Sequence, residues 1–144
     1  MKVMQILREK GTTVYTISPR AEVRTAIDWL NTHRIGALVV LSDCGDLIGI
    51  VSERDIVEAL ARTDSRVLSQ PVVNVMTRDV ITCAPEDRAN DLMAVMTRRR
   101  VRHLVVVDGG RLAGIISIGD LVKARLMELE LESSVLRDAY LRVR

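Results

Sequence analysis

A serine followed three residues later by an aspartate occurs twice in this sequence, each time ahead of an apolar stretch. The two copies are Ser52 with Asp55 and Ser117 with Asp120. A carboxylate can accept paired hydrogen bonds from a vicinal diol, and the N–H groups and dipole at a helix start favour phosphate. The same spacing is that of a capping box, in which serine caps the helix and the acid bonds back to its start. The tetrapeptide alone therefore leaves ligand binding and helix capping both open.

Basic side chains lie near both motifs, but they differ between the two copies. Arg54 stands inside the first motif where the second has Gly119, whereas Arg102 and His103 precede only the second motif. The basic run 98–103 fits a solvated helix C-terminus, where cations complement the helix dipole. Nucleic-acid contact is a weaker interpretation because no stacking aromatics accompany the run. We expect the two copies to be chemically unequal.

The remaining polar residues assemble no catalytic or metal-binding constellation. His33 and His103 have no evident triad partners, and neither a P-loop nor a dinucleotide fingerprint occurs. Cys44 and Cys83 lie 39 residues apart, outside any CxxC or Cys/His cluster, so we expect reduced, structural thiols and no zinc site. The sequence predicts a protein that is not an enzyme.

The two motifs belong to a longer repeat. The segment "RIGALVVLSDCGDLIGIVSERDIV", from Arg34, matches "RVRHLVVVDGGRLAGIISIGDLV", from Arg100. With Ser42 treated as an insertion, 12 of the 23 aligned positions are identical. Upstream, "YTISP" answers "ITCAP" at a constant offset of 66 residues. Units of this size bury a modest fraction of their surface, so we expect the two to pack together, with a ligand site in the cleft between them.

Each repeat predicts the order strand, helix, strand, strand, helix. Apolar residues recur at helical spacing in residues 20–34 and 86–100. Short β-branched runs split by Asp/Gly turns then predict strand pairs, and a second helix follows each pair. The predicted strand pairs cover 37–41 with 47–51 and 104–107 with 112–116. The fold class is therefore mixed α/β (α+β), with two β-α-β-β-α units in a pseudo-two-fold pair.

Composition supports a folded protein with an aliphatic core. The chain is 48% hydrophobic and 28% charged, with no Phe, one Trp and two Tyr. Trp29 falls among apolar helix positions, which indicates core or interface packing. The formal net charge of +2 is not that of a dedicated nucleic-acid binder. Neither a signal peptide nor a membrane-spanning run occurs, so we expect a soluble, cytoplasmic protein without membrane contact.

The C-terminal residues depart from the repeat. They follow an a/d heptad pattern interrupted only by a serine. Its positions are Val122, Leu126, Leu129, Ser133, Leu136, Tyr140 and Val143. Barely three heptads are marginal for an autonomous coiled coil, so we expect this helix to pack on its own module or on a second copy, with partner binding as the alternative. The expected divisions are unit 1 at 1–65, unit 2 at 66–127 and a helical extension at 128–144.

The duplicated units closely resemble tandem CBS domains, the Bateman module, over residues 1 to about 125. The resemblance rests on "GIVSERD" at 49–55 and "GIISIGD" at 114–120, with a Thr and a Pro ahead of each first helix. It implies that the cleft between the units binds AMP, ADP or ATP, and in some family members NAD or S-adenosylmethionine. It also implies a homodimer.

By this resemblance, Asp55 and Asp120 bind ribose hydroxyls, while Ser52 and Ser117 lie near the phosphates. It also implies phosphate contacts for Arg102 and His103, near the start of a strand. The nucleotide is a regulatory ligand and no catalytic cofactor, and its occupancy is passed to an unidentified regulated protein or to the dimer. The alternative is an interaction or dimerisation module with empty clefts. The ligand-binding residues carried over are Thr16, Pro19, Gly36, Ala37, Ser52, Arg54, Asp55, Thr82, Pro85, Val101, Arg102, His103, Ser117, Gly119 and Asp120.

Overall fold

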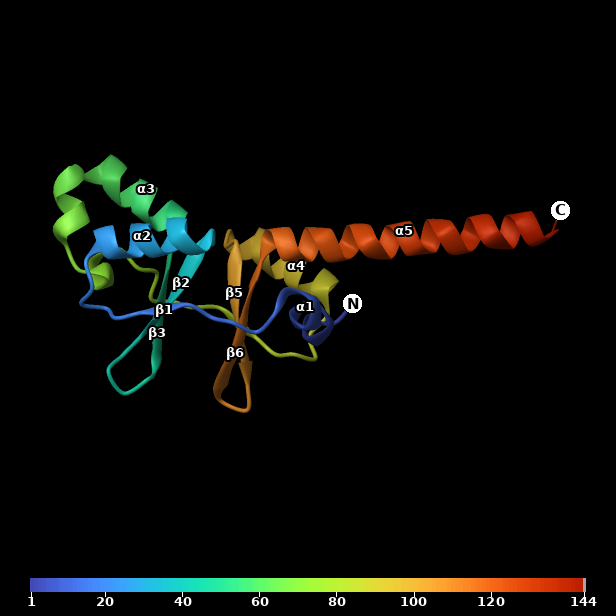
Figure 1. Cartoon of the computed structure of the whole chain (residues 1–144), viewed down its shortest axis with the longest axis horizontal. Coiled ribbons are helices and arrows are strands. Elements are labelled where there is room, and N and C mark those ends of the chain that lie inside the picture. The colour runs from blue at the N-terminus through green and yellow to red at the C-terminus, as the bar shows by residue number, and fades with distance from the viewer. Residues whose placement is uncertain (144) are drawn as a thin grey trace. The chain divides into compact units, whose positions relative to one another are not determined.

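Two three-stranded sheets, each with its own helices, make up the computed structural model, which describes residues 1–143 (Figure 1). They belong to two separate units. The unit that we call the Asp55 unit comprises Thr13–Ile81. The Asp120 unit comprises Met1–Thr12 together with the chain from Thr82 onward. The mixed α/β class and the order of elements predicted for each repeat are confirmed.

The Asp55 unit contains a sheet in the order β1-β2-β3, with β1 parallel and β3 antiparallel to β2. Its elements are β1 (Thr16–Ile17), α2 (Val23–His33), β2 (Ala37–Leu41), β3 (Leu47–Ser52), α3 (Glu53–Arg62) and the 3-10 helices η1 (Ser65–Ser69) and η2 (Val72–Asn74). The central strand β2 has its residues Leu38, Val39 and Val40 fully buried. Burial on both faces explains why this strand reads as a continuous apolar run.

The Asp120 unit repeats this sheet in the order β4-β5-β6. Its elements are α1 (Val3–Lys10), β4 (Thr82–Cys83), α4 (Ala89–Arg99), β5 (His103–Asp108), β6 (Arg111–Ser117) and α5 (Ile118–Val143). The first helix of each repeat, α2 or α4, buries the apolar face that its spacing predicts. The buried residues are Val23, Ala26 and Leu30 in α2 and Ala89, Leu92 and Met96 in α4.

The segment that precedes each repeat in the sequence packs into the unit formed by the other repeat. We call these two segments, residues 1–12 and 72–81, the crossing segments. Helix α1 precedes β1, yet it belongs to the Asp120 unit, where the N–H of Met4 donates to the carbonyl of Pro85. Likewise η2 precedes β4 but belongs to the Asp55 unit, where the N–H of Val73 donates to the carbonyl of Pro19. The compact units therefore do not coincide with the divisions 1–65, 66–127 and 128–144 expected from the sequence. Those divisions stay a prediction about the repeats.

The glycine that opens each motif makes room for these crossing segments. A Cβ atom on Gly49 would lie 2.5 Å from the Sδ of Met76, and one on Gly114 would lie 2.7 Å from a Cδ of Leu7. Real Cβ atoms do not approach heavy atoms so closely. A larger residue at either position would force the neighbouring side chain to move.

Trp29 does not lie in the core, because 42% of its surface is exposed. Its ring is 5.1 Å from that of His33, which stacks on Tyr15 at 3.9 Å between ring centroids. Core packing of Trp29 is therefore wrong, and packing at an interface stays a prediction.

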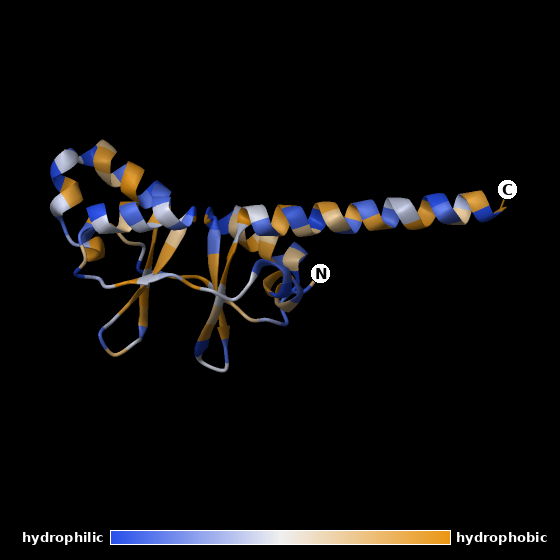
Figure 2. Ribbon diagram, in the orientation of Figure 1, coloured by the Kyte–Doolittle hydropathy of each residue, from blue (hydrophilic) through white to orange (hydrophobic). Residues whose placement is uncertain are grey.

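Helix α5 is the longest element and changes character along its length. Its first turns bury Leu121 and Ala124, whereas every residue that the structure describes from Leu129 onward is exposed. Apolar and polar residues alternate along this exposed part (Figure 2). Within residues 1–143, no helix combines the length and the apolar character needed to cross a membrane.

Candidate functional site

Both serine–aspartate motifs form capping boxes at helix starts. At α3 the N–H of Ser52 donates to Asp55 Oδ2 at 2.8 Å, and the N–H of Asp55 donates to Ser52 Oγ at 3.2 Å. At α5 the equivalent distances for Ser117 and Asp120 are 2.8 and 3.1 Å. The boxes hold each carboxylate in a defined position at the N-terminus of a helix.

Strand pairing brings the first residue of β2 and of β5, with the residue that precedes it, next to the motif of the same unit. Ala37 pairs with Ser52 across the β2–β3 ladder, and His103 pairs with Ser117 across the β5–β6 ladder. The backbone strengthens this arrangement, because the carbonyl of Gly36 accepts the N–H of Glu53 at 3.0 Å. The carbonyl of Arg102 accepts the N–H of Ile118 at 2.9 Å in the same way. The structure thus gathers Gly36, Ala37, Ser52 and Asp55 in one unit and Arg102, His103, Ser117 and Asp120 in the other.

These contacts use two of the first three amides of each helix. The amides that they leave for a ligand are those of Arg54 in α3 and Gly119 in α5, at the second helical position. The Arg54 side chain is half-exposed, and its Nε donates to Glu58 Oε1 at 3.1 Å. The Arg102 side chain is exposed at the start of β5. An anion at the start of α5 would therefore meet the amide of Gly119, and the backbone of Arg102 lies beside that helix start.

The Asp55 carboxylate has a further partner from the crossing segment of its own unit. The hydroxyl of Thr77 donates to Asp55 Oδ1 at 3.0 Å, while Oδ2 accepts the N–H and hydroxyl of Ser52. Backbone bonds between Thr77 and Ile50, at 2.8 and 2.9 Å, hold the threonine in place. Both oxygens of Asp55 therefore accept neutral donors.

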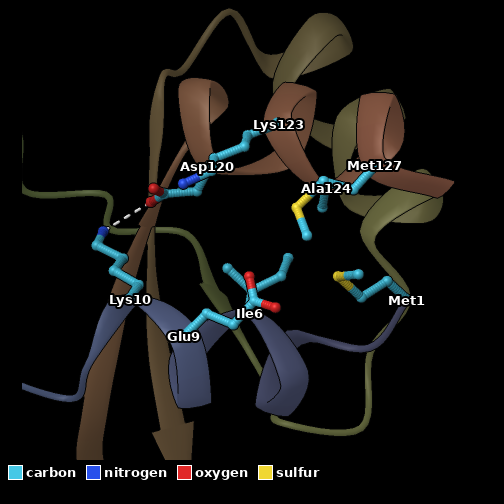
Figure 3. A pocket seen from close by; sticks show the side chains of 8 residues that line it. All are labelled: Met1, Ile6, Glu9, Lys10, Asp120, Lys123, Ala124 and Met127. Atoms are coloured by element: carbon cyan, nitrogen blue, oxygen red, sulfur yellow. Dashed lines mark hydrogen bonds and ion pairs between the residues drawn. The ribbon is translucent and has the colours of Figure 1, made fainter. Parts of the chain in front are cut away.

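The Asp120 carboxylate has a charged partner instead. Lys10, the last residue of α1, places its Nζ 2.6 Å from Asp120 Oδ2 and 2.8 Å from the carbonyl oxygen of Ile115. The two side chains are partly buried, and their ion pair lies at one edge of a pocket of about 150 Å³ between α1 and α5 (Figure 3). The pocket is lined by Met1, Ile6, Glu9, Lys10, Asp120, Lys123, Ala124 and Met127.

The environment of Asp120 changes its acidity. Burial raises the pKa of this carboxyl. The hydrogen bonds from Lys10 and Ser117, together with the charge of Lys10, lower the pKa by more than burial raises it. The net result is a pKa below the ordinary value of 3.8. Asp120 is therefore an acceptor-only carboxylate at neutral pH.

The other predicted site residues lie further along the sheets. Thr16 and Thr82 are exposed in β1 and β4, paired with Val39 and Val105 respectively. Pro19 and Pro85 anchor the crossing segments through their carbonyls, as described above. The N–H of Val101 donates to Met96 at the end of α4. The structure assigns these five residues no side-chain contact with either motif aspartate.

Both cysteines are free thiols, as expected, but their environments differ. Cys44 is exposed, whereas Cys83 is buried in β4. Burial, followed by the charge of Asp87, raises the pKa of the Cys83 thiol to about 12. A structural role therefore fits Cys83, while Cys44 lies in an exposed turn.

Lys10 and Thr77 are the contacts of the motif aspartates that the sequence did not predict. Each lies in a crossing segment, far along the chain from its aspartate, and neither belongs to a recognisable motif. The repeat offset of 66 offers one signal, since it aligns Lys10 with Met76 and Gly11 with Thr77. The crossing segments therefore differ in chemistry where they meet the two carboxylates.

Comparison with known proteins finds the same family by sequence and by structure. The CBS domain family model matches residues 3–62 and 72–127. A CBS-domain protein of Agrobacterium tumefaciens, ATU1752, has a solved structure with a TM-score of 0.84 and 44% identity, covering 86% of this chain and 92% of that one. The chain spans 73%, 41% and 38% of three curated relatives at 34–35% identity.

Two similar structures contain ligands. The CBS-domain protein PAE2072 of Pyrobaculum aerophilum, complexed with AMP, has a TM-score of 0.78 and 28% identity, covering 92% of this chain and 99% of that one. The CBS domain pair of protein MJ0100, in complex with 5′-methylthioadenosine and S-adenosyl-L-methionine, has a TM-score of 0.76 and 26% identity, covering 90% and 98%. With the family model matching both halves around their repeated serine–aspartate motifs, this chain belongs to the CBS-domain family as a tandem CBS pair.

Proposed function

We propose that this chain is a regulatory CBS pair that binds an adenine nucleotide, AMP, ADP or ATP, with Asp55 and Asp120 accepting hydrogen bonds from ribose hydroxyls. The observation that carries the proposal is the pair of capping boxes, which hold a carboxylate at each helix start. The ligands in the two related complexes support it, because AMP, 5′-methylthioadenosine and S-adenosylmethionine share an adenosyl group. A ribose diol is the part of that group that a carboxylate recognises.

The two aspartates offer unequal sites. A diol at Asp55 competes with the hydroxyl of Thr77, which can rotate and accept a hydrogen bond from the ligand. A diol at Asp120 competes with the ammonium group of Lys10 for Oδ2. Breaking a charge-assisted hydrogen bond costs more than turning a hydroxyl. We therefore expect Asp55 to bind the nucleoside more tightly than Asp120 does.

The phosphate end has its own recognition elements. The amide of Gly119 lies in the first turn of α5, and Arg102, whose side chain is exposed, bonds through its carbonyl to the N–H of Ile118 in the same turn. A charge-assisted hydrogen bond contributes about 1.5–3 kcal/mol, so Arg102→Ala should weaken AMP by roughly ten- to 150-fold. Adenosine, which has no phosphate, should be almost unaffected by this change. Equal losses for both ligands would mean that Arg102 supports the fold only.

Regulation requires that occupancy be passed on, and we propose a homodimer as the unit that does so, without catalysis by the chain itself. Exposed apolar side chains on the helices support self-association, with Val57 and Leu60 on α3 and Ile118 and Val122 at the start of α5. Light scattering at micromolar concentration tests the mass. A separate regulated protein is the further partner that we propose.

An interaction module without a ligand is the rival function. It is favoured by the fact that each motif carboxylate already has partners within its own unit. In that case the capping boxes would be purely structural. The two functions make opposite predictions for calorimetry and for thermal unfolding in the presence of AMP.

The decisive experiment titrates AMP and adenosine into the full chain. A ligand at 100 times its Kd stabilises the folded state by about 2.7 kcal/mol, which should raise Tm by roughly 5–10 °C. Asp55→Asn and Asp120→Asn should each remove one site, because an amide retains the shape and one acceptor but presents N–H groups to the diol. Asp46→Asn, in an exposed turn, is the matched control. No heat and no Tm shift in the parent protein would favour the rival.

A further inference from the structure

The exposed end of α5 carries an apolar stripe. Its positions, at alternating spacings of three and four, are Leu126, Leu129, Ser133, Leu136, Tyr140 and Val143. The side chains are exposed to a degree unusual for leucine, 44% for Leu129 and 71% for Leu136. Because this spacing keeps residues on one face of a helix, the stripe runs from Leu126 to the last described residue, with Ser133 as its one polar position.

The exposed part of α5 gains little stability if its apolar side chains face only water. Isolated helices of this length are marginal, and most helical stability in proteins comes from packing an apolar face. The first turns of α5 have this support through Leu121 and Ala124, but the stripe begins where those contacts end. A second helix laid along the stripe would supply the missing contact. Leucine is a side chain that such packing uses at a and d positions.

The charges beside the stripe indicate which helix fits. Glu130 and Arg137 flank it on one side and Glu132 flanks it on the other. In a parallel pair, Glu132 of one copy faces Arg137 of the second copy. In an antiparallel pair with Leu126 opposite Val143, Glu130 faces Arg137 instead. The segment is therefore complementary in charge to itself in either direction.

We propose that residues 126–143 of α5 form a two-stranded helical pair with the same segment of a second copy of this chain. The pair covers the apolar stripe and places glutamate against arginine along its edge. It is a different surface from the α3 and early α5 side chains invoked for the homodimer, and it does not require nucleotide binding. Ser133 is the one polar position within the buried seam.

Hydrogen exchange read at the tail amides tests this pairing in the full chain. Amides of residues 129–143 should exchange at least tenfold more slowly at high micromolar than at low nanomolar protein concentration, because only the paired helix is protected. The double variant Leu129→Glu with Leu136→Glu should abolish this concentration dependence. The matched control is Leu131→Glu with Leu141→Glu, which introduces the same charge at leucines that are 66% and 56% exposed but lie off the stripe.

The outcomes separate cleanly. Slow exchange at high concentration in the parent and the control, with fast exchange in the stripe variant, supports the pairing. Exchange independent of concentration in the parent, or equal in the two double variants, overturns it. Protection that appears only after addition of another protein also overturns it. Mass alone does not decide, since association through the other helices would leave the tail amides unprotected.

Discussion

Replacing Lys10 by methionine tests whether the Lys10–Asp120 ion pair limits access to the Asp120 carboxylate. Lys10 Nζ lies 2.6 Å from Asp120 Oδ2, and the side chains of Lys10 and Asp120 are 34% and 22% exposed. Exposed ion pairs contribute about 0.2–1 kcal/mol, so a partly buried one is worth on the order of 1 kcal/mol. A ligand that must break this pair loses that energy. Lys10→Met should therefore bind adenosine at Asp120 about fivefold more tightly than the parent does.

The assay is calorimetry with adenosine, which carries no phosphate that Lys10 could attract. Lys123→Met is the control, because Lys123 lines the same pocket but forms no ion pair with Asp120 among residues 1–143 (Figure 3). Lys10→Met should also unfold at a slightly lower temperature, since the ion pair stabilises the folded state. Affinity and stability then move in opposite directions. An adenosine Kd at Asp120 that is unchanged in Lys10→Met would refute the competition.

The titration of Asp120 provides an independent readout of the same contact. Although burial raises the pKa of this carboxyl, the hydrogen bonds from Lys10 and Ser117 bring it below 3.8. A carboxyl with a lowered folded-state pKa stabilises the protein above its unfolded pKa, and this stabilisation is lost as the pH falls through the folded pKa. Without Lys10, Asp120 should take up its proton at higher pH, and the difference in stability between the parent and the variant should shrink as the pH falls through the folded-state pKa of the parent. Carboxyl carbon NMR would contradict this if both proteins titrated together.

Two further predictions concern the crossing segments and the thiols. Gly114→Val should destabilise the fold by about 1–3 kcal/mol, since the valine side chain would collide with Leu7. Adding Leu7→Ala should restore part of this loss, as measured by chemical denaturation. Equal stability of Gly114→Val and the parent would contradict the packing of α1. Iodoacetamide at pH 8 should label Cys44 while sparing Cys83, because burial raises the pKa of Cys83 to about 12. Equal labelling rates, measured by mass spectrometry, would show that Cys83 is accessible.

The order of elements and the capping boxes could be predicted from the sequence because they depend on local chemistry. The apolar spacing that buries Val23 and Leu30 is a property of a single helix, and Ser52 and Asp55 interact within one helical turn. Duplication strengthened each local prediction, since the same pattern occurs twice.

Tertiary structure alone decided what surrounds the motif aspartates. Lys10 and Asp120 are separated by 110 positions, and no local pattern connects them. Their contact exists because α1 folds onto the second repeat, and Gly114 leaves the space in which Leu7 packs. Likewise, Thr77 reaches Asp55 only because its segment pairs with β3. Asp55 accepts a hydrogen bond from a hydroxyl and Asp120 accepts one from an ammonium group, yet both belong to the same sequence motif. The difference arises from long-range packing, which the motif does not encode.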